Sequence, residues 1–316
     1  MTLRSTPNNV PKNVLPAGMK DEALVDAIIA SGYPLQGLVA ASLLGEFGVV
    51  EEWDYIDDDS KLHRNLDLMA WRRLTPTRES SLAPELRLLI ECKKSRQPYV
   101  FFRSVTESVA PRFPAFAGLS RDLLTISTPA GAATADIHPT SLLCLQSDHY
   151  VLDPPACSVM SRAYPKGEKV DLSGSEAYSD LVLPLTKGLR HLQVQLRPER
   201  DPWRPTVVLL VAVLDAPMLL VESPTEAGDP SFCPWVRVVR REPQETIRAP
   251  RSRFYSVDVV HKDYLSTYLS ESVFPFAELF AARCQEKPRL FSGRAIVPSF
   301  ESWQWHEVAE ESRNRQ

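Results

Sequence analysis

Two ionisable side chains stand close together directly after an apolar stretch, 88–90, of this chain. Glu91 follows that stretch, and Lys93 comes two residues later. Side chains of a β-strand alternate between its two faces, so Glu91 and Lys93 are predicted to share a face, while Ile90 and Cys92 point the other way. Charged groups at the end of an apolar strand need partners or a task, because burying a charge without either is costly. This pair is therefore the first candidate for a site, and a solvated strand end is the alternative.

Two more carboxylates are predicted to lie near this pair. Asp67 lies on a strand at about 63–74, which a polar connection should fold back against the third strand, at about 85–94. Glu46 lies on a helix predicted at about 35–47, and at about 100° per residue it falls inside the apolar stripe of that helix. Clustered carboxylates raise one another's pKa values and suit a hard divalent cation, so Mg²⁺ or Mn²⁺ is the expected cofactor. Glu46 has an alternative, a wetter edge where the helix frays before Gly48.

These residues resemble the motifs of the PD-(D/E)xK nucleases, which have the restriction-endonuclease-like fold. The resemblance rests on Asn65-Leu66-Asp67 as the aspartate motif, on Ile90-Glu91-Cys92-Lys93 as the ExK motif, and on Glu46 as the acid of the preceding helix. It implies that Asp67, Glu91 and the backbone carbonyl of Cys92 bind Mg²⁺. It also implies that Glu46 completes the metal shell and that Lys93 is catalytic. One departure is Leu66, which stands where the family name has proline.

The same resemblance implies a fold. An α/β protein with a restriction-endonuclease-like core is expected, with a central mixed β-sheet flanked by helices and a long insertion after the third strand, at about 104–174. The run at 206–214 is rich in leucine and β-branched residues, which is typical of a strand covered on both faces. A single nuclease domain is predicted at 20–300, between a flexible lead-in at 1–19 and a polar tail at 301–316.

Composition limits the class of protein. The chain has 316 residues, 44% of them hydrophobic, and a net charge of −4, which is ordinary for a globular protein and gives no global attraction to nucleic acid. Five cysteines without CxxC spacing argue against a disulfide framework and fit a reducing cytoplasm. The longest apolar run is too short to span a bilayer, so no membrane partner is expected. Neither GxxxxGK[ST] nor GxGxxG occurs, so no nucleotide cofactor is expected.

Basic residues near the site and later in the chain are candidate nucleic-acid contacts. Arginine forks suit phosphate oxygens. Lys94 and Arg96 follow the ExK motif, and six arginines lie in one later stretch with two glutamates: Arg237, Arg240, Arg241, Arg248, Arg251 and Arg253. An ordinary charged surface is the alternative reading of both groups.

Together these features predict a Mg²⁺-dependent nuclease that hydrolyses DNA phosphodiester bonds, in restriction, phage defence or DNA repair. Two alternatives stay open: a catalytically inactive scaffold or nucleic-acid-binding module with the same fold, and an RNA-cleaving nuclease. The near-neutral charge favours the scaffold, whereas the intact set of Asp67, Glu91 and Lys93 favours the enzyme. Cutting both strands of a duplex generally requires two active sites, so a homodimer would fit the predicted function.

Overall fold

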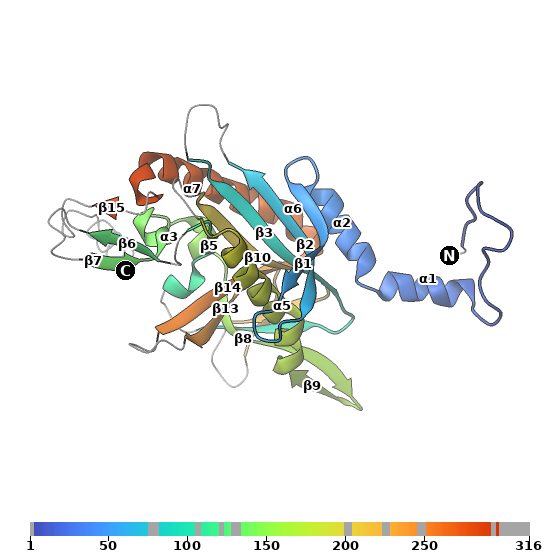
Figure 1. The fold of residues 1–316 in the computed structure, drawn as a ribbon. Coiled ribbons are helices and arrows are strands. Elements are labelled where there is room, and N and C mark those ends of the chain that lie inside the picture. The colour runs from blue at the N-terminus through green and yellow to red at the C-terminus, as the bar shows by residue number, and fades with distance from the viewer. Residues whose placement is uncertain are drawn as a thin grey trace.

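The computed structural model in Figure 1 describes residues 3–74, 82–104, 109–119, 123–127, 134–198, 204–222, 228–244, 251–291 and 295–296. Within these ranges the chain is an α/β protein with a large mixed sheet of twelve strands. Helices pack on both faces of this sheet. The predicted class, a central mixed sheet flanked by helices, is confirmed at this level.

The N-terminal side of the sheet is the predicted antiparallel meander. Strands β1 (Gly48–Ile56), β2 (His63–Arg73) and β3 (Glu85–Lys94) pair in sequence order. Helix α5 (Gly174–Gln195) then precedes β10 (Thr206–Asp215), which pairs with β3 in parallel. β3 and β10 are mostly buried on both faces, which places them in the interior of the sheet.

The other strands extend the sheet beyond β10. The order continues through β14 (Arg251–His261), β13 (Trp235–Gln244), β8 (Ala156–Lys166), β4 (Tyr99–Arg103), β11 (Met218–Val221) and β12 (Pro230–Phe232). β5 (Ala115–Ala117) pairs with β10, and β9 (Lys169–Ser173) pairs with β8. A small second sheet joins β15 (Ala295–Ile296), β6 (Leu124–Ser127) and β7 (Thr134–Ile137). The stretch at 104–174 is therefore built into the main sheet through β8.

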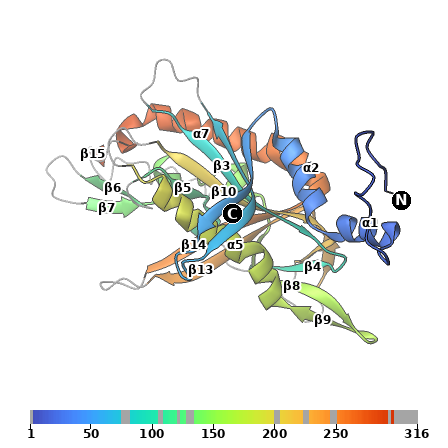
Figure 2. The ribbon, with the colours of Figure 1, turned by 45° about the vertical axis from the view of Figure 1, so that its right-hand side comes forward.

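Two apolar layers enclose the sheet. Leu181, Leu185 and Leu189 of α5 pack on one face, with Leu210 of β10. Helices α2 (Tyr33–Leu43) and α7 (Phe274–Glu286) pack on the opposite face (Figure 1, Figure 2). Shorter helices complete that second layer: η1 (Ala110–Arg112), α3 (Pro139–Leu142), α4 (His149–Leu152), η2 (Lys262–Tyr264), α6 (Leu265–Thr267), the π-helical η3 (Tyr268–Val273) and η4 (Pro288–Phe291). The candidate site lies at the edge of the α5 layer.

The N-terminal helix stands apart from this body. α1 (Asp21–Ala30) has no buried residue, and it projects from the sheet together with the chain before it (Figure 1). In the described part of the chain no single helix is long and apolar enough to cross a membrane; α1 and α2 pass that test of length and composition only as a pair bent by 54°. α2 itself buries Leu35, Val39 and Leu43 in the protein core.

Candidate functional site

The candidate site lies where β2 and β3 separate. Their antiparallel pairing ends at Leu68 and Ile90, so Asp67 and Glu91 are the next residues on the two strands. In place of a backbone pair, the Asp67 carboxylate accepts a hydrogen bond of 2.6 Å from the backbone N–H of Cys92. The predicted hairpin closure is present, and it brings Asp67 alongside Glu91.

Glu91 and Lys93 form an ion pair on the α5 face of β3. Lys93 Nζ donates to Glu91 Oε1 at 2.6 Å, as the period of the strand predicts. Only 7% of the Glu91 side chain is exposed, and its second oxygen, Oε2, is buried without a hydrogen-bond partner. Burial raises the pKa of Glu91 to about 7, and the charge of Asp67 adds to this rise while Lys93 opposes it. The Glu91 carboxylate thus lacks a hydrogen-bond partner for one of its two oxygens, because Lys93 contacts only the other.

The charges around Lys93 keep it protonated. Burial by itself would lower the pKa of Lys93, but the carboxylates of Glu91, Asp67 and Asp180 together raise it above its usual value. Asp180 reaches the site from α5 and is held by Arg162 of β8 at 2.9 Å. α5 and β8 therefore close the site from one side, and Asp180 adds a third acid to Asp67 and Glu91.

Asp67 is likewise partly shielded from water. Burial raises its pKa, the hydrogen bond from Cys92 lowers it, and the negative charge of Glu52 contributes to the rise. Two acids with raised pKa values beside one another are the electrostatic conflict that a divalent cation resolves.

The oxygen atoms at this site fit the coordination of a divalent cation that keeps part of its water shell. Asp67 and Glu91 supply two carboxylates, and the buried, unpartnered Glu91 Oε2 is an oxygen that a cation would satisfy. The Cys92 carbonyl lies on the same side of β3 as the Cys92 N–H that contacts Asp67. Within the described ranges no three His, Cys, Asp or Glu side chains gather closely enough to hold a metal ion. Mg²⁺ needs no more than one or two carboxylates, because it retains several waters.

The prediction for Glu46 is wrong. α2 ends at Leu43, so Glu46 lies in the turn before β1 and has no place on the apolar face of a helix. Its side chain is 58% exposed and forms an ion pair of 2.7 Å with Arg72 of β2. Glu46 therefore lies outside the candidate site.

Two residues that the sequence pattern did not single out lie beside Asp67. Gln36 is buried in the first turn of α2, and its Nε2 donates to Glu52 Oε1 at 2.9 Å and to the backbone carbonyl of Asp67 at 3.0 Å. Glu52 lies opposite Asp67, where the pairing of β1 with β2 is interrupted, and its φ of 51° is in the left-handed region. Such strain in a residue other than glycine is often found at functional sites. The helical projection could have found Gln36, because at about 100° per residue it falls about 20° from the buried Leu43.

The prediction that Arg237 contacts nucleic acid is also wrong. Arg237 has no exposed surface, and its Nε and Nη2 donate to the two carboxylate oxygens of Asp258 at 2.7 and 3.0 Å. Asp258 also accepts 2.7 Å hydrogen bonds from the hydroxyls of Tyr150 and Tyr268. Arg237 is therefore the centre of a buried polar cluster that joins β13 and β14 to the helices around them.

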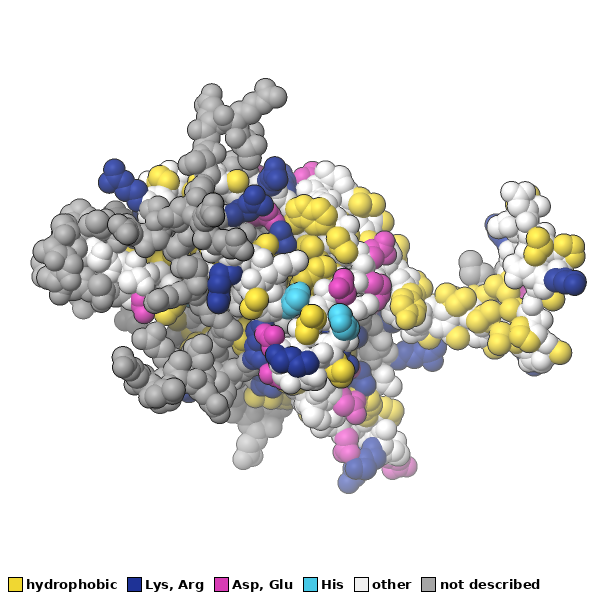
Figure 3. All heavy atoms as spheres, viewed as in Figure 1, with side chains coloured by type: hydrophobic (Ala, Val, Ile, Leu, Met, Phe, Trp, Pro, Cys, Tyr) yellow, Lys and Arg dark blue, Asp and Glu magenta, His cyan; other side chains and the backbone are white. Residues whose placement is uncertain are grey.

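The other predicted basic contacts are dispersed. Lys94 pairs with Asp215 at 3.3 Å, Arg96 is exposed, and Arg240 stacks on Tyr178 with 4.6 Å between its guanidinium carbon and the ring centroid. Arg241 is exposed on β13. Arg248 lies outside the described residues, as do the side chains of Arg251 and Arg253. On the face drawn in Figure 3, Lys and Arg side chains lie scattered among acidic ones and form no continuous strip.

Comparisons with known proteins found no relative. No protein-family model matches the chain, and no curated protein or solved structure shows significant similarity to it. What the chain does must therefore be argued from the geometry of this site.

Proposed function

We propose that this chain is a Mg²⁺-dependent nuclease with a restriction-endonuclease-like core, which hydrolyses DNA phosphodiester bonds with Asp67, Glu91 and Lys93. The observation that carries the proposal is the buried Glu91 carboxylate, which is held by Lys93 on one oxygen and lies beside Asp67 where two strands part. The order of the core elements also supports it: α2, β1, β2 and β3 are followed, after the segment from β4 to β9, by α5 and β10, as expected of that core with an insertion.

The reaction can be assigned to the residues in hand. A Mg²⁺ ion held by the carboxylates of Asp67 and Glu91 and the carbonyl of Cys92 would activate a water molecule and offset charge on the phosphate. Lys93 keeps its proton at neutral pH because the surrounding carboxylates raise its pKa. It therefore stabilises negative charge that develops on the phosphoryl oxygens, and it does not act as the base. Asp67 and Glu91 are already fixed by hydrogen bonds before substrate binds, which lowers the cost of reaching the reactive geometry.

A cleavage assay with matched variants tests the proposal. Linear and supercoiled DNA should be cut in Mg²⁺ or Mn²⁺ and left intact in EDTA. Glu91→Ala and Lys93→Ala should each abolish cutting, whereas Glu46→Ala should retain it because Glu46 lies outside the site. Cleavage of RNA alone would reassign the substrate. If wild type and variants all bind nucleic acid equally and none cuts, the catalytic proposal fails and the scaffold alternative replaces it.

A further inference from the structure

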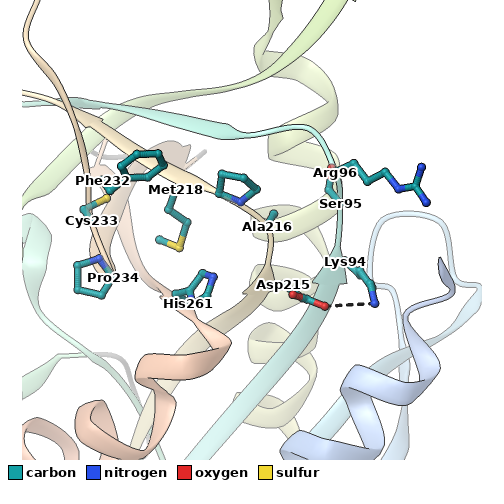
Figure 4. A pocket seen from close by; sticks show the side chains of 11 residues that line it. Lys94, Ser95, Arg96, Asp215, Ala216, Met218, Phe232, Cys233, Pro234 and His261 are labelled. Carbon is teal, nitrogen blue, oxygen red and sulfur yellow. Dashed lines mark ion pairs between the residues drawn. The ribbon is translucent and has the colours of Figure 1, made fainter. Parts of the chain in front are cut away.

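A large pocket opens beside the candidate site, at the carboxyl ends of β3, β10 and β14. Its volume is about 650 Å³, within the usual range for pockets that bind small molecules. Lys94, Asp215 and His261 mark the three strand ends, and the connections that lead to β11 and β13 supply the far wall (Figure 4). The pocket therefore lies at the edge where parallel strands most often place a ligand.

The far wall of this pocket is apolar and aromatic. Phe232 and Met218 lie next to one another in Figure 4, and Pro217 and Pro234 also line this pocket. Met218 is buried, whereas Phe232 is 81% exposed, more than any other large hydrophobic residue in the described part of the chain. An aromatic ring that is left in water beside a pocket is a surface on which another flat ring can stack.

The near wall carries charge and hydrogen-bonding groups. Lys94 Nζ forms an ion pair of 3.3 Å with Asp215, and this pair lies at the mouth of the pocket (Figure 4). His261 Nδ1 accepts a hydrogen bond from the backbone N–H of Asp263, so in its neutral form its Nε2 carries the proton. In Figure 4, His261 lies below Met218 beside the apolar wall, whereas Lys94 and Asp215 lie at the other end of the pocket. The pocket thus combines a donor, an acceptor and a cation with an apolar wall. This combination suits a flat heteroaromatic ring that is linked to an anionic group, which is the chemistry of a nucleotide.

The position of the pocket relative to the candidate site follows from β3 itself. Lys93 and Lys94 are consecutive, and side chains alternate along a strand, so Lys93 remains with Glu91 while Lys94 lines the pocket. Their Cα atoms are about 3.8 Å apart. Because the two side chains point to opposite faces of β3, a nucleic-acid strand with its phosphate at Lys93 would pass around the carboxyl end of β3 to bring its adjoining nucleotide to Lys94 and the mouth of the pocket.

We propose that this pocket receives the unstacked base of the nucleotide next to the scissile phosphate, so that the substrate is a single strand or an unpaired end. The inference rests on the proposed function, because it takes the Lys93 site to hold the phosphate. A base within a duplex reaches such a pocket only after it leaves its pair and its stack. This unstacking costs free energy, and the cost is smallest for a base that is already single-stranded. Phe232 would stack on the base, and Lys94 would lie beside the phosphate.

Binding in EDTA tests the inference without cleavage. The full chain is titrated into a fluorescein-labelled 12-nucleotide single strand and into the blunt duplex of the same sequence, and anisotropy is measured. The wild type should bind the single strand more tightly, and Phe232→Ala should weaken that binding about 5- to 150-fold while leaving duplex binding unchanged. Phe232→Trp should retain it. Phe254→Ala is the matched control, because Phe254 is also exposed, at 44%, and does not line this pocket.

Equal binding of single strand and duplex, or unchanged single-strand binding by Phe232→Ala, would overturn the inference. The two proposals can fail separately. If Glu91→Ala abolishes Mg²⁺-dependent cleavage while Phe232→Ala binds like wild type, the pocket assignment is wrong and the nuclease assignment stands. If single-strand binding depends on Phe232 while no nucleic acid is cut, the pocket binds an unstacked base, but its place beside a scissile phosphate is overturned together with the catalytic proposal.

Discussion

Ionisation of Glu91 should couple pH, stability and cation binding in this protein. Burial raises the pKa of Glu91 from an ordinary 4.5 to about 7, so the folded chain holds this proton more tightly than the unfolded chain does. The stability that this group contributes is therefore fully present below about pH 4.5 and is lost as the pH rises through 7. The loss attributable to Glu91 is roughly 3 kcal/mol, from 1.36 kcal/mol per pKa unit.

A divalent cation should reverse this loss only where the carboxyl is ionised. With a pKa of about 7, roughly nine-tenths of the Glu91 side chains are ionised at pH 8 and about one-tenth at pH 6. Because a metal binds the deprotonated carboxylate, apparent affinity for Mg²⁺ should fall about tenfold between these two pH values. The stabilisation by a fixed concentration of Mg²⁺ should fall with it.

Urea unfolding at pH 5, 6, 7 and 8, in EDTA and in Mg²⁺, measures both effects. The relevant quantity is the difference in unfolding free energy between wild type and Glu91→Gln, in which the contributions of titrating groups that do not interact with Glu91 cancel. That difference should shift against the wild type as the pH rises in EDTA, and Mg²⁺ should recover it at pH 8. Glu46→Gln is the control and should behave as wild type, since Glu46 is exposed and pairs with Arg72.

Two results would refute this reasoning. One is stabilisation by Mg²⁺ that is as large at pH 6 as at pH 8. The other is stabilisation of Glu91→Gln by Mg²⁺ to the wild-type extent, which would place the cation elsewhere.

Further predictions concern the residues that hold the site and the sheet in place. Arg237→Met should lower the unfolding free energy by about 3–5 kcal/mol in urea, because it leaves a buried carboxylate unpaired, whereas Arg96→Met on the surface should leave it nearly unchanged. Gly188→Ala should be less stable than Gly37→Ala by roughly 1–3 kcal/mol, because a Cβ at Gly188 would lie 2.5 Å from a core leucine methyl while Gly37 faces open space; equal stabilities would contradict this packing. Gln36→Leu should slow Mg²⁺-dependent cleavage through the loss of two hydrogen bonds at the site, and unchanged kinetics would separate Gln36 from it.

The meander and β10 could be predicted because their signals are local. Polar and apolar side chains on opposite faces define β1 and β2, and apolar runs define β3 and β10. The facing of Glu91 and Lys93 follows from strand alternation alone. The class of fold therefore follows from patterns that lie within single elements.

The end of α2 was mispredicted although a signal for it was present. Leu44 already has extended backbone, and Gly45 has a φ of 98°, the left-handed conformation that glycine commonly adopts after a helix. Extending the helix past Gly45 placed Glu46 on the wrong surface. The strained conformation of Glu52, by contrast, has no signal in the sequence, since it arises from the interrupted pairing of two strands.

The sequence alone could not distinguish the buried Arg237 from the arginines on the surface. It pairs directly across the β13–β14 ladder with Asp258, and the register of that ladder decides the pairing. Its other acceptors, the backbone carbonyls of Tyr150 and Arg112, come from segments far away in the chain. An arginine with long-range partners has the same local sequence as one in solvent.

The parallel pairing of β3 with β10 also sets the order in which this chain can fold. Its partners, from Glu85 with Thr206 to Lys94 with Asp215, are more than a hundred residues apart, so the ladder closes a long loop. The meander contains only local contacts and can form soon after its residues leave the ribosome. During synthesis, Glu91 and Lys93 therefore remain exposed to solvent until α5 and β10 have been made. Only then does the Glu91 carboxylate become buried.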